Sequence, residues 1–119
     1  MDSAETAKAY RRRADAREVE RLRRFDELRD HARSMAGELR RALGPRIRVY
    51  LFGSLLDVDQ FRGHSDIDLA VEGLTPSEYW EAGRRLETLS GKTGVDLVRM
   101  ETASKGLRDA ILAADEILT

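Results

Sequence analysis

Three aspartates lie in two short apolar segments that have the composition of buried β-strands. Asp66 and Asp68 open the first segment, and Asp96 lies in the second. Because successive side chains of a strand point to opposite faces, Asp66 and Asp68 share a face that excludes Ile67. Magnesium prefers oxygen ligands and is usually held by one or two carboxylates together with substrate phosphates. The pattern therefore predicts a magnesium site of the kind that nucleoside triphosphates use.

The elements that must position these aspartates follow from hydrophobic patterning. Strands are predicted over residues 46–52, 66–72 and 95–100. Gly53-Ser54 ends the first strand and has the composition of a phosphate loop, and Ser54 also suits the cap of a short helix there. The remaining predicted elements are a helix over residues 75–90 that begins with a capping box of Thr75 and Glu78 around Pro76, a helix over residues 104–113 and a terminal strand over residues 116–119.

A long N-terminal helix is predicted from about Ala4 to Leu43, and Gly44-Pro45 ends it. Apolar residues at steps of three or four form one stripe along it: Val19, Leu22, Phe25, Leu28, Ala32, Met35, Leu39 and Leu43. At about 1.5 Å per residue the helix spans on the order of 55 Å, which exceeds the width of a domain of this size. We therefore expect its first part to protrude or to pack on another chain.

Length and composition favour one small domain. The 119 residues suffice for a single modest core, and we divide them into the N-terminal amphipathic helix, residues 1–44, and a core over residues 45–119. The absence of cysteine excludes disulfides and thiolate metal sites, and there is neither a membrane-length apolar stretch nor a signal-peptide profile. These features predict a cytoplasmic protein that does not engage a membrane.

The net charge of -1 conceals an uneven distribution along the chain. Residues 1–48 contain 14 Arg or Lys against 9 Asp or Glu, whereas residues 49–119 contain 7 against 13. Such asymmetry is typical of proteins that bind an acidic partner, nucleic acid or their own copies. A solvated, arginine-rich helix surface is the simpler explanation, and nucleic acid is not favoured as a partner.

Two motifs at a defined spacing carry a family resemblance. The chain resembles the nucleotidyltransferase superfamily of DNA polymerase beta type in Leu51-Phe52-Gly53-Ser54, in Ser65-Asp66-Ile67-Asp68-Leu69-Ala70-Val71 and in the later Val95-Asp96-Leu97-Val98. Its small size is similar to that of the minimal nucleotidyltransferases, the MNT group. The resemblance covers roughly residues 46–119 and implies an α+β fold: a small mixed β-sheet with helices packed on one face, here preceded by the long N-terminal helix.

The resemblance also implies a division of roles within the site. The Gly-Ser pair would hold the triphosphate of ATP, because glycine allows close backbone approach and serine donates to a phosphate oxygen. The first two aspartates would bind two Mg2+ ions, and the third would ligand the second ion or draw the proton from the acceptor hydroxyl. The residues implied in nucleotide binding are Gly53, Ser54 and Ser65, and those implied in catalysis and metal binding are Asp66, Asp68 and Asp96.

One departure from the family pattern lies in the loop after the Gly-Ser pair. Many members place an arginine and a glycine there, whereas this chain has Leu55-Leu56-Asp57-Val58-Asp59. A basic residue near the phosphates is thus missing, and Arg62 or Lys92 would have to fold over the site to replace it. Simpler interpretations of the acids are a solvated strand-end turn for the Asp-x-Asp pair and a solvated edge-strand acid at Asp96.

Three functions remain open, and we rank them. The first is a Mg2+-dependent nucleotidyltransferase that moves AMP from ATP to a hydroxyl on a protein partner, as the antitoxin of a HEPN-type toxin. Its N-terminal helix would dock that partner or a second copy of the chain, giving a homo-oligomer. The second is a small-molecule or RNA nucleotidyltransferase. The third is a catalytically weak partner-binding module of the same fold.

Overall fold

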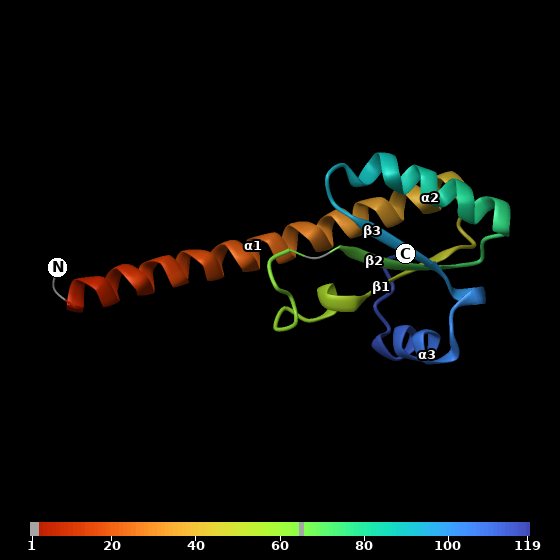
Figure 1. Cartoon of the computed structure of the whole chain (residues 1–119). Coiled ribbons are helices and arrows are strands. Elements are labelled where there is room, and N and C mark those ends of the chain that lie inside the picture. The colour runs from red at the N-terminus through yellow and green to blue at the C-terminus, as the bar shows by residue number, and fades with distance from the viewer. Residues whose placement is uncertain (1–2, 65) are drawn as a thin grey trace.

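The computed structural model describes residues 3–64 and 66–119 (Figure 1). Its elements in chain order are α1 (Ser3–Leu43), β1 (Arg48–Phe52), the 3-10 helix η1 (Gly53–Leu56), β2 (Ile67–Glu72), α2 (Pro76–Ser90), β3 (Val95–Arg99), the 3-10 helix η2 (Met100–Thr102) and α3 (Lys105–Ala114). Every helix and strand predicted before the C-terminal segment is present, and each lies within about two residues of its expected ends.

The three strands form one mixed sheet in the order β1-β2-β3. β1 pairs antiparallel with β2, which sets Phe52 opposite Asp68, and β2 pairs parallel with β3, which sets Asp68 opposite Asp96. Alternation of side chains divides the strand residues between two apolar clusters, one on each face. Ile67 joins the larger cluster, whereas Ala70, which shares a face with Asp68, joins the smaller one.

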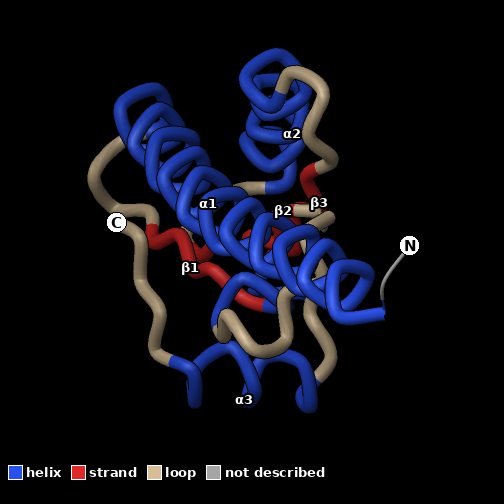
Figure 2. The backbone as a smooth tube through the Cα atoms, turned by 90° about the vertical axis from the view of Figure 1, so that its left-hand side faces the viewer, coloured by secondary structure: helices blue, strands red, loops and turns tan. Residues whose placement is uncertain are grey.

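Helices cover the two faces of the sheet unequally (Figure 2). α1 and α2 pack on one face over the larger cluster, in which Leu39 is completely buried. α3 lies on the other face, where Ile111 packs in the smaller cluster with Tyr50. The predicted α+β fold with helices on one face therefore holds for α1 and α2, and α3 adds a short third layer. This layer leaves Asp66 and Asp96 exposed.

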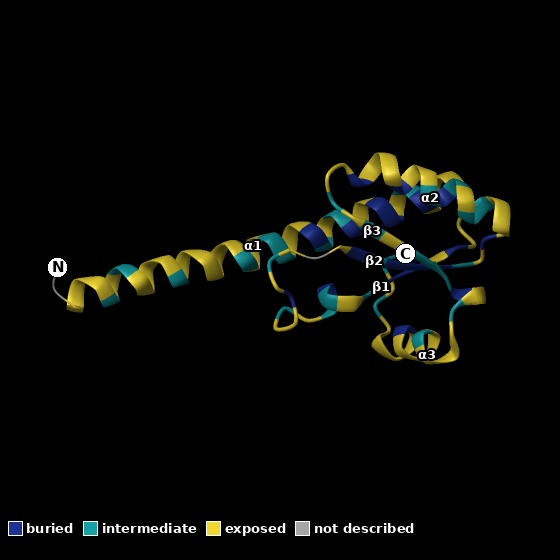
Figure 3. Ribbon diagram, viewed as in Figure 1, coloured by how far each residue is buried: buried dark blue, intermediate teal, exposed yellow. Residues whose placement is uncertain are grey.

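α1 extends far beyond the sheet, as predicted. All its buried residues lie between Leu28 and Leu43, and its first half is almost entirely exposed (Figure 3). In that half, Val19 is 66% exposed and Leu22 is 41% exposed. The molecule measures 65 × 29 × 17 Å along its principal axes, so residues 3–20 project from it as an arm. The second half of α1 packs in the same core as the sheet. The division of the chain into residues 1–44 and 45–119 stays a prediction.

The start of α2 follows the predicted capping box. The Thr75 side chain accepts a hydrogen bond from the backbone N–H of Glu78, and the Glu78 side chain accepts one from the backbone N–H of Thr75. Pro76 occupies the first turn, where no intrahelical donor is needed. Glu78 also pairs with Arg46, which lies before β1. The cap therefore fixes both the beginning of α2 and its position beside the sheet.

The C-terminal segment differs from the predicted strand. Residues 116–119 form a single antiparallel bridge, between Ile117 and Tyr50, and no extended strand. Backbone hydrogen bonds nevertheless join the segment to β1, from Leu118 N–H to Val49 C=O at 2.7 Å and from Leu51 N–H to Glu116 C=O at 2.9 Å. The segment thus covers the outer edge of β1, although it is too short and irregular to form a regular ladder.

Burial along α1 predicts a sharp contrast between its two halves. Leu39→Ala should lower the free energy of unfolding by about 2–5 kcal/mol, because it leaves a cavity in a fully buried site. Val19→Ala, the matched control on the arm, should change it by less than about 0.5 kcal/mol. Urea denaturation followed by circular dichroism measures both. Equal losses in the two variants would show that the arm is packed against another chain in solution.

Candidate active site

Asp68 and Asp96 lie side by side near the starts of β2 and β3. They are directly opposite each other in the parallel ladder, in which neighbouring strands are about 4.8 Å apart. Asp66 lies just before β2 and shares the face of Asp68, as the alternation predicts. Asp66 and Asp96 are exposed, and Asp68 is half-buried. The three predicted acids therefore gather at one end of the sheet, on the face that α3 covers in part.

This crowding changes the acidity of the central carboxylate. The pKa of Asp68 is raised from 3.8 to about 6, first because the side chain is partly buried. The negative charges of Asp96 and Asp66 raise this pKa further, as does a hydrogen bond shared with the Asp96 carboxyl group. The site therefore accumulates negative charge that bulk solvent does not fully compensate, which is the electrostatic condition for binding a cation.

Gly53 forms the neighbouring wall of the site. Its φ angle of +79° lies in the left-handed region that favours glycine. A Cβ atom at this position would collide with the Asp68 carboxylate, so the peptide backbone at Gly53 lies directly against that side chain. Ser54 is the second residue of η1, whereas the N-cap position belongs to Phe52. The interpretation of Ser54 as a helix cap is therefore wrong.

The chemistry of this cluster fits magnesium. All the candidate ligands are carboxylate oxygens, which Mg2+ prefers, and the pKa of Asp68 is raised to about 6 by partial burial and then by the charges of its neighbours. Within residues 3–64 and 66–119, no three acidic or histidine side chains converge into a complete metal-binding cage. This agrees with the usual way of holding Mg2+, in which one or two carboxylates act together with substrate phosphates. Asp66, Asp68 and Asp96 are the residues that would hold it.

A hollow of about 410 Å³ adjoins Asp66 on the side of β3. It is lined by Arg24 of α1, by His64 and by Lys92 of the turn between α2 and β3. A Cβ atom at Gly94 would collide with the Asp66 carboxylate, so this carboxylate lies against the backbone of the same turn. The cationic and titratable side chains of three separate segments thus surround the exposed side of Asp66.

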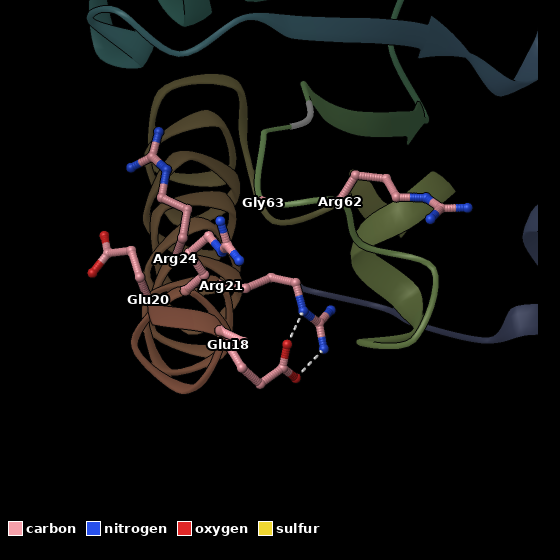
Figure 4. Close-up of a pocket in the computed structure, with 8 residues that line it drawn as sticks. Glu18, Glu20, Arg21, Arg24, Arg62 and Gly63 are labelled. Carbon is pink, nitrogen blue, oxygen red and sulfur yellow. Dashed lines mark hydrogen bonds and ion pairs between the residues drawn. The ribbon is translucent and has the colours of Figure 1, made fainter. Parts of the chain in front are cut away.

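The two basic residues considered as substitutes for the missing arginine lie in different places. Lys92 lines the hollow beside Asp66. Arg62 lines a separate groove of about 600 Å³ between α1 and the loop after η1, and Figure 4 shows its side chain pointing away from the arginines of α1. Lys92 is therefore the better placed of the two. Ser65, predicted to contact the nucleotide, lies outside the described residues.

The loop after the Gly-Ser pair, which differs from the family pattern, is held by contacts that the sequence motifs do not reveal. Arg21 of α1 donates hydrogen bonds to the backbone carbonyls of Val58 and Phe61, the latter at 2.9 Å, and is held by an ion pair with Glu18 (Figure 4). Phe61 is buried and packs on Phe25 with ring centroids 5.6 Å apart. The loop that follows the Gly-Ser pair is therefore anchored to α1.

A second arginine of α1 supports η1 itself. Arg29 donates to the carbonyl of Leu55 at 2.6 Å and forms an ion pair with Glu116 of the C-terminal segment. Sequence reasoning missed Arg21 and Arg29, because among the many arginines of α1 neither differs in type or spacing from its solvent-exposed neighbours. The apolar residue Phe61 within an otherwise polar loop was the available signal that the loop packs on the domain.

Comparison with protein families identifies the fold and its class. Residues 45–119 match the family described as polymerase beta, nucleotidyltransferase. Because this match includes well over half of the chain, the protein belongs to that family, and its enzyme class is that of a nucleotidyltransferase. The predicted family resemblance is thus confirmed. No curated protein matches the chain in sequence comparison.

Solved structures with the same fold come from toxin–antitoxin systems. A toxin–antitoxin crystal structure with AMP-PNP is 31% identical, with a TM-score of 0.57, and the match covers 73% of this chain and 72% of that one. A mutant MntA-HpeT toxin–antitoxin is 28% identical, with a TM-score of 0.56, covering 73% of this chain and 71% of that one. The mutant carries two Asp-to-Glu changes two positions apart, the spacing of Asp66 and Asp68.

None of the described helices is long and apolar enough to cross a membrane.

The raised pKa of Asp68 predicts a pH-dependent gain in stability when the charge is removed. Below about pH 4 the carboxyl group is protonated in both the folded and unfolded states, so Asp68→Asn should equal wild type. Between about pH 4 and pH 6 the unfolded state has released this proton while the folded state still holds it, so the free energy of unfolding falls over this range and is constant above about pH 6. Wild type thus loses stability, and Asp68→Asn should be more stable by on the order of 1 kcal/mol at pH 8.

Urea denaturation in EDTA at pH 4 and pH 8 measures this difference. Asp109→Asn, at an exposed position on α3, is the control and should show no comparable gain at pH 8. If Asp68→Asn is less stable than wild type at pH 8, the crowding of carboxylates inferred here is wrong.

The backbone at Gly53 predicts a specific intolerance to any side chain. Gly53→Ala should lower the free energy of unfolding by about 1–2 kcal/mol, because alanine is strained at positive φ and its methyl group meets the Asp68 carboxylate. Gly106→Ala, on α3 with open space around the added methyl group, is the matched control and should be neutral or stabilising. Thermal denaturation of both variants tests this, and similar melting temperatures would remove the proposed constraint at Gly53.

Proposed function

We propose that this nucleotidyltransferase transfers AMP from ATP to a hydroxyl group on a protein partner, in a reaction that requires Mg2+. The observation that carries the proposal is the cluster of Asp66, Asp68 and Asp96 beside the left-handed turn at Gly53. A carboxylate cluster next to backbone in a conformation that favours glycine suits a substrate that is itself a polyanion bound through cations. ATP is the substrate proposed, and the solved AMP-PNP complex of similar fold supports it.

Each residue of the cluster has a proposed task. Gly53 and Ser54 position the triphosphate, since the glycine leaves the backbone open and the serine hydroxyl can donate to a phosphate oxygen. Two Mg2+ ions, held by Asp66 and Asp68, would supply positive charge at the α-phosphate and at the leaving pyrophosphate. The acidic cluster thus contributes positioning and charge, which are the main requirements of phosphoryl-type transfer.

Asp96 is proposed as the residue that receives the proton of the acceptor. The acceptor oxygen forms a bond to the α-phosphorus, the bond from that phosphorus to the bridging oxygen of pyrophosphate breaks, and the hydroxyl proton passes to the Asp96 carboxylate. The exposure of Asp96 supports this task, because an acceptor on another molecule can reach it. The partly buried Asp68 is the less accessible member of the pair.

We further propose that the protein is the antitoxin of a toxin–antitoxin pair and that its partner is a HEPN-type toxin. The toxin–antitoxin structures of similar fold support this role. The exposed apolar residues Val19, on the arm, and Leu22, just after it, offer a surface for the partner or for a second copy. We assign the reaction to the cytoplasm, where ATP and Mg2+ are available.

The groove between α1 and the loop favours a second candidate, an RNA acceptor. Four arginines line it, Arg17, Arg21, Arg24 and Arg62, together with Glu18 and Glu20 (Figure 4). Cationic grooves of this kind bind phosphate backbones. We rank RNA second because Glu18 and Glu20 pair with Arg21 and Arg23, which reduces the positive charge of the groove.

Transfer of radiolabelled AMP tests both candidates. The full chain is incubated with Mg2+, ATP labelled at the α-phosphate, and either the toxin encoded beside it or bulk tRNA. We expect label on the toxin, lowered at least about 10²-fold by Asp66→Ala, and unchanged by Asp109→Ala, an exposed acid on α3. Label on tRNA alone would favour the second candidate. Transfer that survives Asp66→Ala would exclude this site as the catalytic centre.

A further inference from the structure

One edge of the sheet is covered and the other is open. The C-terminal segment hydrogen-bonds to β1 and covers its outer edge. β3 is the opposite edge strand, and among residues 3–64 and 66–119 no strand lies beyond it. Uncovered edges invite pairing with another chain, and proteins usually shield them. The edge left open here belongs to the strand that carries Asp96.

The ladder between β2 and β3 identifies which backbone groups are open. Ile67 N–H donates to Gly94 C=O at 2.9 Å, so in a parallel ladder the backbone groups of Asp96 turn toward β2. Those of Val95 and Leu97 turn outward. Tyr79 of α2 donates its hydroxyl to the Leu97 carbonyl at 2.6 Å and so occupies one of these groups. No other described residue bonds to the N–H and C=O of Val95 or to the N–H of Leu97, which leaves these groups open to an added strand.

A groove accompanies this open edge. It has a volume of about 400 Å³ and runs between α2 and β3, where Gly83 and Leu86 form one wall and Val95 and Leu97 the other. Gly83 has no atom within 4 Å of the position a Cβ would take, so this wall is open at its centre. The groove ends at Gly94, against whose backbone the Asp66 carboxylate lies. The apolar walls of the groove and the open backbone groups of β3 therefore lead to the end of the sheet at which the acids lie.

From this continuity we propose that the acceptor is an extended peptide segment, which adds to β3 as a fourth strand and lies in the groove beside α2. The proposal rests on the proposed protein AMP transfer. Strand addition between an edge strand and a helix is an established way to bind peptides: main-chain hydrogen bonds supply affinity, and alternate side chains enter the groove. A bulkier helical segment could not use the edge groups of Val95.

The register of the added strand selects the acceptor residue. Side chains directly opposite each other on neighbouring strands lie on the same face. A residue opposite Asp96 therefore points to the face of the catalytic acids, while its two neighbours point into the apolar groove. Because the backbone groups of Asp96 face β2, an antiparallel addition makes this a non-hydrogen-bonded pair, with Cα atoms about 4.5 Å apart and side chains close together. The acceptor sequence is thus apolar–hydroxyl–apolar.

Peptide binding without nucleotide tests this inference separately from catalysis. The probe is a heptapeptide, acetyl-Lys-Val-Val-Tyr-Val-Val-Lys-amide, added to the full chain in EDTA and followed by NMR. We expect the backbone amide signals of Val95 and Leu97 to shift, and an otherwise identical peptide N-methylated at the two central valines to bind at least about tenfold more weakly, since it lacks edge hydrogen bonds.

Two variants and one control locate the binding site. Val95→Pro removes an outward N–H without removing a bond to β2, and Gly83→Leu fills the groove from a helix that leucine favours. Both should weaken binding of the tyrosine peptide by about tenfold or more. Gly37→Leu, an exposed glycine in α1 with open space around it, adds the same side chain elsewhere and should leave binding unchanged. Thermal denaturation checks that each variant is folded.

The outcomes separate the inference from the proposed function. If the peptide binds at β3 but receives no AMP when ATP and Mg2+ are added, the strand-addition site stands and the proposed transfer fails. If Val95 and Leu97 do not shift, or Gly83→Leu binds as well as wild type, strand addition is wrong whatever the activity. A concentration-dependent dimer that protects the same amides in the absence of peptide would show that β3 pairs with its own copy, and would also overturn the inference.

Discussion

Repulsion between carboxylates on neighbouring strands is the constraint around which this small protein is built. Asp68 and Asp96 are opposite each other because the register of β2 and β3 fixes them there. A one-residue slip of β2 against β3 would relieve the repulsion, but it would also turn the buried side of the slipped strand outward. Ile67 and Leu69 are completely buried on that side, so burial of apolar surface holds the acids together at an electrostatic cost. A bound cation would remove this repulsion, so the electrostatic cost of folding becomes binding free energy for the cation.

α1 performs two separate tasks in this arrangement. Its second half covers the sheet and supplies much of the apolar core that fixes the register. Arg21, just after the arm, and Arg29, in the first turn of the buried half, hold the loop that follows the Gly-Ser pair through backbone carbonyls. The loop lacks the arginine that is common in the family and contains two additional acids. Arg21 and Arg29, which belong to α1, nevertheless hold it in position. The helix therefore stabilises both the strands and the turn on which nucleotide binding depends.

The sequence was sufficient for the elements before the C-terminal segment and for the face of the sheet on which Asp68 lies. Strand alternation puts the side chains of Asp68 and the buried Ile67 on opposite faces of the sheet, and the capping box at Thr75 fixes the start of α2. Both signals are local in the sequence. What the chain alone did not reveal depends on contacts between distant segments. The role of Arg21 requires knowing that Phe61 folds back onto α1, and the hollow formed by Lys92 beside Asp66 requires the turn before β3 to approach that acid.

The open edge of β3 is consistent with the proposed recognition of the acceptor. A fourth strand at this edge would satisfy the N–H and C=O of Val95 and the N–H of Leu97, yet it would also close the groove between α2 and β3, which ends at Gly94 beside Asp66. The β1 edge, which lies farther from Asp96, is covered by the C-terminal segment instead. The position that a fourth strand would occupy is thus left beside the acid proposed to take the acceptor proton. Substrate binding can then complete the sheet, which joins recognition of the acceptor to its placement for reaction.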